Sequence, residues 1–96
     1  MLHLVFQSPI ETAILERSDS GDVIVFLENS VLRILQKGAL SDSLSRQLTT
    51  NRLCVLSDDI SVRGIMAEEL VKGIEVIDYA ELVDLTIKNT VIQSWC

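Results

Sequence analysis

A chain of 96 residues can form one hydrophobic core but not two, so we expect a single domain over residues 1–96. Hydrophobic residues make up 48% of the chain and aromatic residues only 4%, so Leu, Ile and Val should dominate the core. The 14 Asp and Glu residues outnumber the 8 Lys and Arg residues and give a net charge of −6. This charge repels a phosphate backbone and disfavours direct binding to nucleic acid.

Four short apolar runs along the chain predict β-strands. Segments with helical spacing lie between them, and this alternation is typical of an α/β domain with a mainly parallel sheet and right-handed crossovers. The final stretch TVIQSWC is expected to add a short edge strand, with Trp95 packed on the flank of the sheet. The four apolar runs are Leu2–Phe6, Val23–Leu27, Leu53–Leu56 and Ile74–Ile77.

Capping signals predict where two of the helices begin. The stretch SPIE places Ser8 at a cap position and Pro9 at the first helical position. Asp78, with Glu81 three residues later, predicts a second helix that runs through Asn89. The longer connection between residues 29 and 51 is interrupted by a glycine and a Ser-rich stretch, so one helix or two short ones are expected there.

Ligands of open parallel sheets bind beyond the carboxyl ends of the strands. Polar residues follow the predicted strands at these ends, but several of them are ordinary helix-capping types at expected helix starts. We therefore favour capping over a ligand role for Ser8, for one of Asp58 and Asp59, and for Asp78. The polar residues at these ends are Gln7, Ser8, Glu28, Asn29, Ser57–Asp59, Asp78 and Tyr79.

The chain has two cysteines and one histidine as candidates for chemistry. Cys54 is flanked by apolar residues, which predicts a buried thiol with a raised pKa and little reactivity. Cys96 is a weak candidate for a catalytic or sulfur-carrying thiol, because no basic neighbour lowers its pKa. His3 lies early in the first strand, away from the carboxyl-end residues, and a half-buried structural role is expected.

The motifs that mark cofactor, metal and membrane binding are missing from the sequence. No cysteine and histidine spacing suits a metal, and no glycine motif suits a nucleotide, so we expect neither a metal nor a cofactor. The N-terminal stretch MLHLVFQSPIE lacks the features of a signal peptide, and no apolar run approaches the length of a membrane span. A cytoplasmic location without membrane association is therefore expected.

An ordered set of short motifs covers essentially the whole chain. It comprises MLH, SP, GD before an apolar strand, SDDISVRG, IEVIDYAELVDLT and QSW. Together they resemble the TusB/DsrH family of small sulfur-relay subunits. The resemblance implies a DsrE-like fold of three α/β/α layers around a five-stranded, mainly parallel sheet, in agreement with the four strands and possible fifth predicted above.

The resemblance also implies partners and a pathway. TusB-like chains associate with TusC-like and TusD-like chains in a heterohexamer that passes persulfide sulfur to a TusE-like acceptor, for 2-thiolation of the wobble uridine of tRNA. DsrH-like chains serve a related assembly in dissimilatory sulfur trafficking. Some of these carry a cysteine in the first helix, but Ile10–Ser18 contains none. The chain therefore resembles the TusB type, which lacks its own sulfur-carrying thiol.

The residues within the shared motifs are expected to act in structure or at an interface. Arg63 and Tyr79 are the best candidates for interface anchors, because Arg and Tyr are enriched at interface hot spots. An exposed helix charge is the alternative for Arg63. Gly64, placed inside a helix, would indicate close packing against a strand or partner. The full set is His3, Ser8, Asp59, Arg63, Gly64, Asp78, Tyr79 and Trp95.

The sequence thus predicts a non-catalytic subunit of a TusBCD-like sulfurtransferase complex. Three alternatives remain open. The chain could be a DsrH-like subunit in dissimilatory sulfur trafficking, or it could accept sulfane sulfur directly on Cys96 or Cys54. It could also be a stand-alone homo-oligomer of the same fold with a regulatory role.

Overall fold

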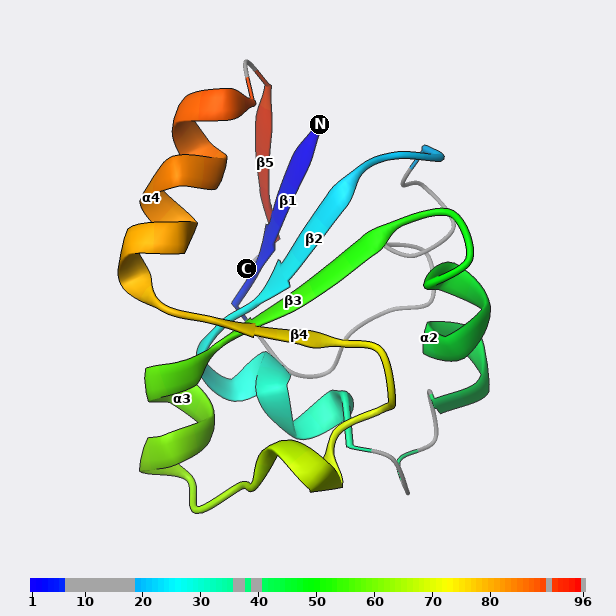
Figure 1. The fold of residues 1–96 in the computed structure, drawn as a ribbon, viewed down its shortest axis with the longest axis vertical. Helices are drawn as coiled ribbons and strands as arrows, with labels where there is room; N and C mark the ends of the chain where they lie inside the picture. The colour runs from blue at the N-terminus through cyan, green and yellow to red at the C-terminus, as the bar shows by residue number, and fades with distance from the viewer. Residues whose placement is uncertain (7–18, 36–37, 39–40, 90, 96) are drawn as a thin grey trace.

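The fold is built on one sheet of five parallel strands in the order β4-β3-β2-β1-β5 (Figure 1). The structure, a computed structural model, describes residues 1–6, 19–35, 38, 41–89 and 91–95. The predicted α/β class with a mainly parallel sheet of four to five strands is confirmed. The strands are β1 (Leu2–Val5), β2 (Val23–Phe26), β3 (Arg52–Leu56), β4 (Glu75–Ile77) and β5 (Ile92–Trp95).

Strand β2 and residues 53–56 of β3 are apolar without interruption because both faces of the sheet are covered. Successive side chains of a strand point to opposite faces. In β2, Ile24 and Phe26 belong to one buried cluster, whereas Val25 belongs to the other. In β3, Leu53 packs in the first of these clusters and Cys54 in the second.

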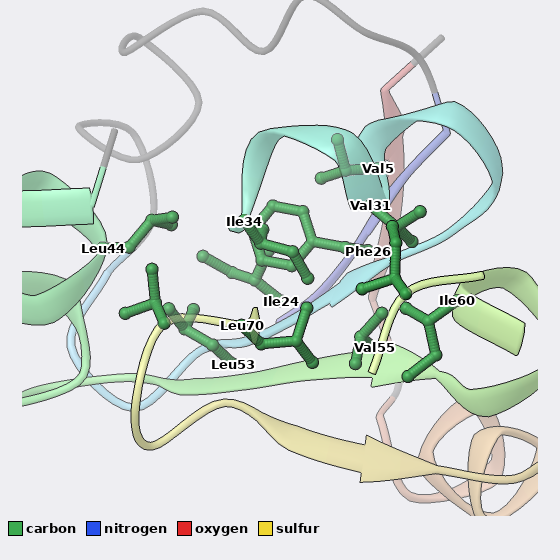
Figure 2. Close-up of a cluster of buried hydrophobic side chains, with 12 residues drawn as sticks. Val5, Ile24, Phe26, Val31, Ile34, Leu44, Leu53, Val55, Ile60 and Leu70 are labelled. Carbon is green, nitrogen blue, oxygen red and sulfur yellow. The ribbon is translucent and has the colours of Figure 1, made fainter. Parts of the chain in front are cut away.

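The helices form the two outer layers. Residues of η1, α2 and α3 pack in the first cluster, which Figure 2 shows around Phe26, Ile34 and Leu44. Leu85 of α4 packs in the second cluster, on the opposite face of the sheet. The helical elements are η1 (Glu28–Arg33), α2 (Ser41–Gln47), α3 (Ser57–Val62), η2 (Ala67–Glu69) and α4 (Tyr79–Lys88).

Several local predictions are confirmed by these elements. The connection from residue 29 to residue 51 contains two short helices, η1 and α2, and the C-terminal stretch forms β5 at the edge of the sheet. Helix α4 begins after Asp78, whose Oδ1 accepts a hydrogen bond of 2.8 Å from the backbone N–H of Glu81. The helix predicted after Ser8 lies outside the described residues, as does the side chain of Trp95.

Gly64 does not lie inside a helix, so the position expected for it is wrong. Helix α3 ends at Val62 with Arg63 as its C-cap, and Gly64 follows with a φ of 68°. A Cβ added at Gly64 would meet no atom within 4 Å. The glycine is needed because left-handed backbone ends the helix, and other residues adopt that conformation at a cost.

Candidate functional site

Asp59 joins two elements at the carboxyl ends of β2 and β3. Its Oδ2 accepts a hydrogen bond of 2.8 Å from the backbone N–H of Glu28, the first residue of η1. Glu28 has a φ of 52°, a left-handed conformation that is unfavourable for a residue with a side chain. The carboxylate of Asp59 therefore helps to hold a strained backbone at the edge where parallel sheets bind ligands.

Neither Asp58 nor Asp59 caps helix α3, which corrects the sequence interpretation. The N-cap position belongs to Leu56, and no side chain forms a capping hydrogen bond there. Both aspartates lie in the first helical turn, where their charge interacts favourably with the helix dipole. The capping geometry is lost because the helix begins directly where β3 ends.

Arg63 is held against Asp59 rather than extended into solvent. Its Nη1 donates a hydrogen bond of 3.0 Å to the backbone oxygen of Asp59 and lies 3.8 Å from the Oδ1 of the same residue. About a quarter of the Arg63 side chain is exposed. Arg63 thus stabilises the last turn of α3 and still presents part of its guanidinium to the surface.

Asp78 and Tyr79 lie side by side at the carboxyl end of β4 and have different roles. Asp78 is the cap of α4, as predicted. Tyr79 is 60% exposed, which leaves its ring available for contact with another molecule. Asp78 therefore has a structural role, whereas the interface role of Tyr79 remains a prediction.

His3 is fully buried at the opposite edge of the sheet, although the sequence indicated a half-buried position. Its Nε2 lies 2.9 Å from Oδ2 of Asp22. Asp22 also accepts hydrogen bonds of 3.0 Å from the backbone nitrogens of Met1 and Asp19. Burial alone would raise the pKa of Asp22, but these bonds, that of His3 foremost, outweigh burial and lower the pKa to about 2.

Asn51 completes this buried polar cluster. Its Nδ2 donates hydrogen bonds to the backbone oxygens of Asp19, at 2.6 Å, and Asp22, at 3.1 Å. Neither Asp22 nor Asn51 is among the site residues expected from the sequence. The signal that could have identified them is their position, because Asp22 directly precedes β2 and Asn51 directly precedes β3. The cluster satisfies its buried polar groups internally, which indicates a structural role.

Cys54 is fully buried in β3, as the sequence predicted. The pKa of the Cys54 thiol is raised to about 12, and burial is the largest cause. Glu75 raises the pKa further, whereas the charge of Arg52 lowers it by a smaller amount than burial raises it. The thiol lies 3.5 Å from Oε2 of Glu75, which also pairs with Arg52. Such a thiol has almost no thiolate at neutral pH and is a poor nucleophile.

The described residues offer little for metal or membrane binding. No group of three or more His, Cys, Asp and Glu side chains among them could hold a metal ion. Within the same part of the chain, no helix is long and apolar enough to cross a membrane. Cys96 and Ser8 lie outside the described residues.

The fold resembles that of a solved protein of unknown function from Methanobacterium thermoautotrophicum. The similarity has a TM-score of 0.78 and covers 97% of this chain and 95% of that protein, at 13% sequence identity. An identity this low shows a shared fold alone. The protein thus has an α/β fold, built on a five-stranded parallel sheet, that it shares with that protein.

Sequence comparison assigns the family. The family model described as DsrH like protein matches residues 6–92, and this chain belongs to that family. Proteins named TusB from Buchnera aphidicola subsp. Baizongia pistaciae and from Pectobacterium parmentieri are each 33% identical to it. A TusB protein from Cronobacter sakazakii is 30% identical. Each alignment covers 99% of this chain and the whole of the relative. The resemblance to the TusB/DsrH family is thereby confirmed.

Proposed function

We propose that this chain is a sulfur-relay subunit of the TusB type, which supports persulfide transfer without carrying the sulfur itself. Its membership of the DsrH-like family, together with full-length relatives named TusB, supports a place in sulfur relay. The burial of Cys54 is the observation that supports the non-catalytic role. This thiol is fully buried, and its pKa is raised to about 12. A thiol of this kind is unsuited to accept sulfur from a donor protein.

The proposal includes specific partners. The chain associates with TusC-like and TusD-like subunits in a heterohexamer, and the complex passes sulfur to a TusE-like acceptor for 2-thiolation of the tRNA wobble uridine. The net charge of −6 supports an adapter that does not itself bind tRNA. A single domain over residues 1–96 and a cytoplasmic location belong to the same proposal.

Two partly exposed residues are proposed as contacts with these partners. Tyr79 is more than half exposed, and the guanidinium of Arg63 is partly exposed while Asp59 fixes its direction. A side chain that is already held in place loses less entropy when a partner binds. By contrast, His3 is buried and Asp78 acts as a helix cap, so both act within the subunit.

Replacing both cysteines tests the non-catalytic role. In cells that carry Cys54→Ser together with Cys96→Ser, we expect tRNA 2-thiouridine to stay within about twofold of the wild-type level. Serine at position 54 keeps a donor for Glu75 and changes the volume of the core little. The level is measured by mass spectrometry of digested tRNA, and cells lacking the chain serve as the control.

Recovery of the intact complex from the same cells makes the result decisive. Loss of thiouridine while the doubly substituted chain still co-purifies with its partners would contradict the proposal. In that case one of the two cysteines would carry sulfur. Single Cys54→Ser and Cys96→Ser variants would then identify which of them does so.

A further inference from the structure

The segment from α3 to η2 carries half of the net charge of the chain. Residues 57–69, which are 13 of the 96 residues, have a net charge of −3 out of the total of −6. In Figure 1 this segment forms the lower margin of the fold, where the chain leaves α3 and turns towards η2. An acidic margin of this kind attracts positively charged molecules. The charged residues of the segment are Asp58, Asp59, Arg63, Glu68 and Glu69.

Two exposed apolar side chains lie within this acidic segment. Val62, the last residue of α3, is 81% exposed, and Met66 is 61% exposed. The backbone N–H of Ile65 donates a hydrogen bond of 2.9 Å to the backbone oxygen of Ile60, so the chain folds back after the helix. Met66 therefore stays at the end of α3 that carries Val62. Exposed apolar side chains with a polar rim are typical of a surface that contacts another protein.

Two of the carboxylates in the segment are used within the subunit. Asp59 accepts the hydrogen bond from the backbone N–H of Glu28 and lies beside Arg63. Oε1 of Glu69 accepts a hydrogen bond of 3.0 Å from the backbone N–H of Met66. Asp59 thus compensates the charge of Arg63, and the segment stays acidic at its surface.

The other two carboxylates, those of Asp58 and Glu68, are exposed. Within the part of the chain that the structure describes, neither of them forms a hydrogen bond or an ion pair. Asp58 lies four positions before Val62, on the same side of α3. Glu68 follows Met66 by two positions, so their Cα atoms lie within about 8 Å of each other. Each exposed apolar side chain therefore has a carboxylate nearby, and we call these four residues the α3 corner.

We propose that the α3 corner docks on a partner protein whose matching face has Lys and Arg side chains around an apolar centre. Val62 and Met66 pack on that centre, and Asp58 and Glu68 pair with the cations around it. A second copy of this chain would bring the same carboxylates together, and nucleic acid or an anionic membrane would bring phosphate groups to them. Charge opposes all three of these alternatives. The inference rests on the proposed function, in which Arg63 of the same segment contacts the relay subunits, and it names the chemistry of their face.

Photo-cross-linking in cells tests the docking surface. The full chain with p-benzoylphenylalanine in place of Val62 is expressed in its own cells and irradiated, and mass spectrometry identifies the cross-linked segment. We expect a segment of another protein with two or more Lys or Arg residues beside apolar ones. The control has the cross-linker in place of Ser45, which is exposed on α2, across the fold from α3 in Figure 1. A cross-link to an acidic segment or to a second copy, or equal yields from the two positions, would overturn the proposal.

Charge reversal tests the role of the two carboxylates. Asp58→Lys combined with Glu68→Lys should lower the yield of the cross-linked product from position 62 about tenfold or more. The matched control is Asp19→Lys combined with Asp42→Lys, which reverses two other exposed acidic charges. Asp42, like Asp58, lies in the first turn of a short helix, so both pairs of substitutions lose a similar interaction with a helix dipole. The control pair should keep the yield within about threefold, and equal losses from both pairs would contradict the proposal.

A model peptide tests the same chemistry with this chain alone. The probe is an amphipathic peptide of Leu and Lys, and a peptide of Leu and Glu with the same pattern is the control. The Leu and Lys peptide should shift the methyl NMR signals of Val62 and Met66, and the shifts should diminish in about 0.5 M NaCl, where charges are strongly screened. Unchanged methyl signals, or equal shifts with the two peptides, would count against the α3 corner.

The results in cells separate this surface from the sulfur-relay role. A basic cross-linked segment in a protein unrelated to sulfur relay would support the docking surface and contradict the proposed function. Recovery of the relay subunits without a cross-link from position 62 would support the proposed function and overturn the docking surface.

Discussion

Replacement of Asp22 by Ala is expected to lower the free energy of unfolding by about 2–3 kcal/mol, the typical cost of removing a charged partner from a buried hydrogen-bonded cluster. The substitution removes the carboxylate that contacts Nε2 of His3, a side chain that is fully buried at the amino edge of the sheet. It also removes the acceptor of two backbone nitrogens, those of Met1 and Asp19. Chemical denaturation at neutral pH measures the effect.

Asp19→Ala is the matched control. It changes a neighbouring carboxylate but keeps the backbone N–H that binds Asp22, and residue 19 is exposed. We expect this variant to stay within about 0.5 kcal/mol of the wild type. Equal losses for Asp19→Ala and Asp22→Ala would show that the buried cluster does not depend on the Asp22 carboxylate.

The same carboxylate predicts a dependence of stability on pH. The pKa of Asp22 is lowered from 3.8 to about 2 in the folded protein, so the folded state binds the proton less tightly than the unfolded chain. The contribution of the Asp22 carboxylate to the free energy of unfolding is therefore fully present above about pH 4, and it is lost as the pH falls towards 2. Asp22→Asn should flatten the stability curve in this window relative to the wild type. Parallel curves for the two proteins would contradict this account.

Two glycine substitutions should differ in a way that the local geometry explains. Gly64→Ala should cost about 1 kcal/mol, because Ala must adopt a left-handed backbone but meets no neighbouring atom. Gly73→Ala should cost about 2 kcal/mol or more, since left-handed strain combines there with contact. Gly73 has a φ of 104°, and its added Cβ would lie 2.9 Å from Cδ1 of Leu48. Leu48 packs against the core and must shift.

Thermal or chemical unfolding of the two variants tests this comparison. A second variant, Gly73→Ala combined with Leu48→Ala, separates the contact from the strain. If the contact contributes, the loss from Gly73→Ala should be smaller in the Leu48→Ala background than in the wild type. An equal loss in both backgrounds, or a larger loss at Gly64 than at Gly73, would show that the contact has no effect.

Local signals were sufficient to predict most of the fold. The apolar runs of β2 and β3 are continuous because the sheet is covered on both faces, and this pattern is legible in the sequence. The cap of α4 was predicted from Asp78 and Glu81 because both partners lie within four residues of each other. Strand, helix and cap signals of this kind depend on neighbours in the chain.

The parts that sequence reasoning missed depend on contacts between distant residues. Asp22 meets His3 across 19 positions, and Asp59 meets the backbone of Glu28 across 31. Sequence spacing does not predict such pairs, since strand order and register decide them. Gly64 is misplaced for a different reason, because α3 ends at Val62 and the glycine lies just beyond its C-cap, Arg63. A glycine near a helix end can be mistaken for one in the middle.

The central claim, that this chain acts in a sulfur relay without carrying the sulfur, is tested most directly by native mass spectrometry of the tagged chain isolated gently from its own cells. We expect a mixed complex with two small homologous subunits, and a mass increase of one sulfur atom on a cysteine of one of those partners. The same measurement should find no such increase on Cys54 or Cys96. A persulfide on this chain, or a particle that contains this chain alone, would contradict the account.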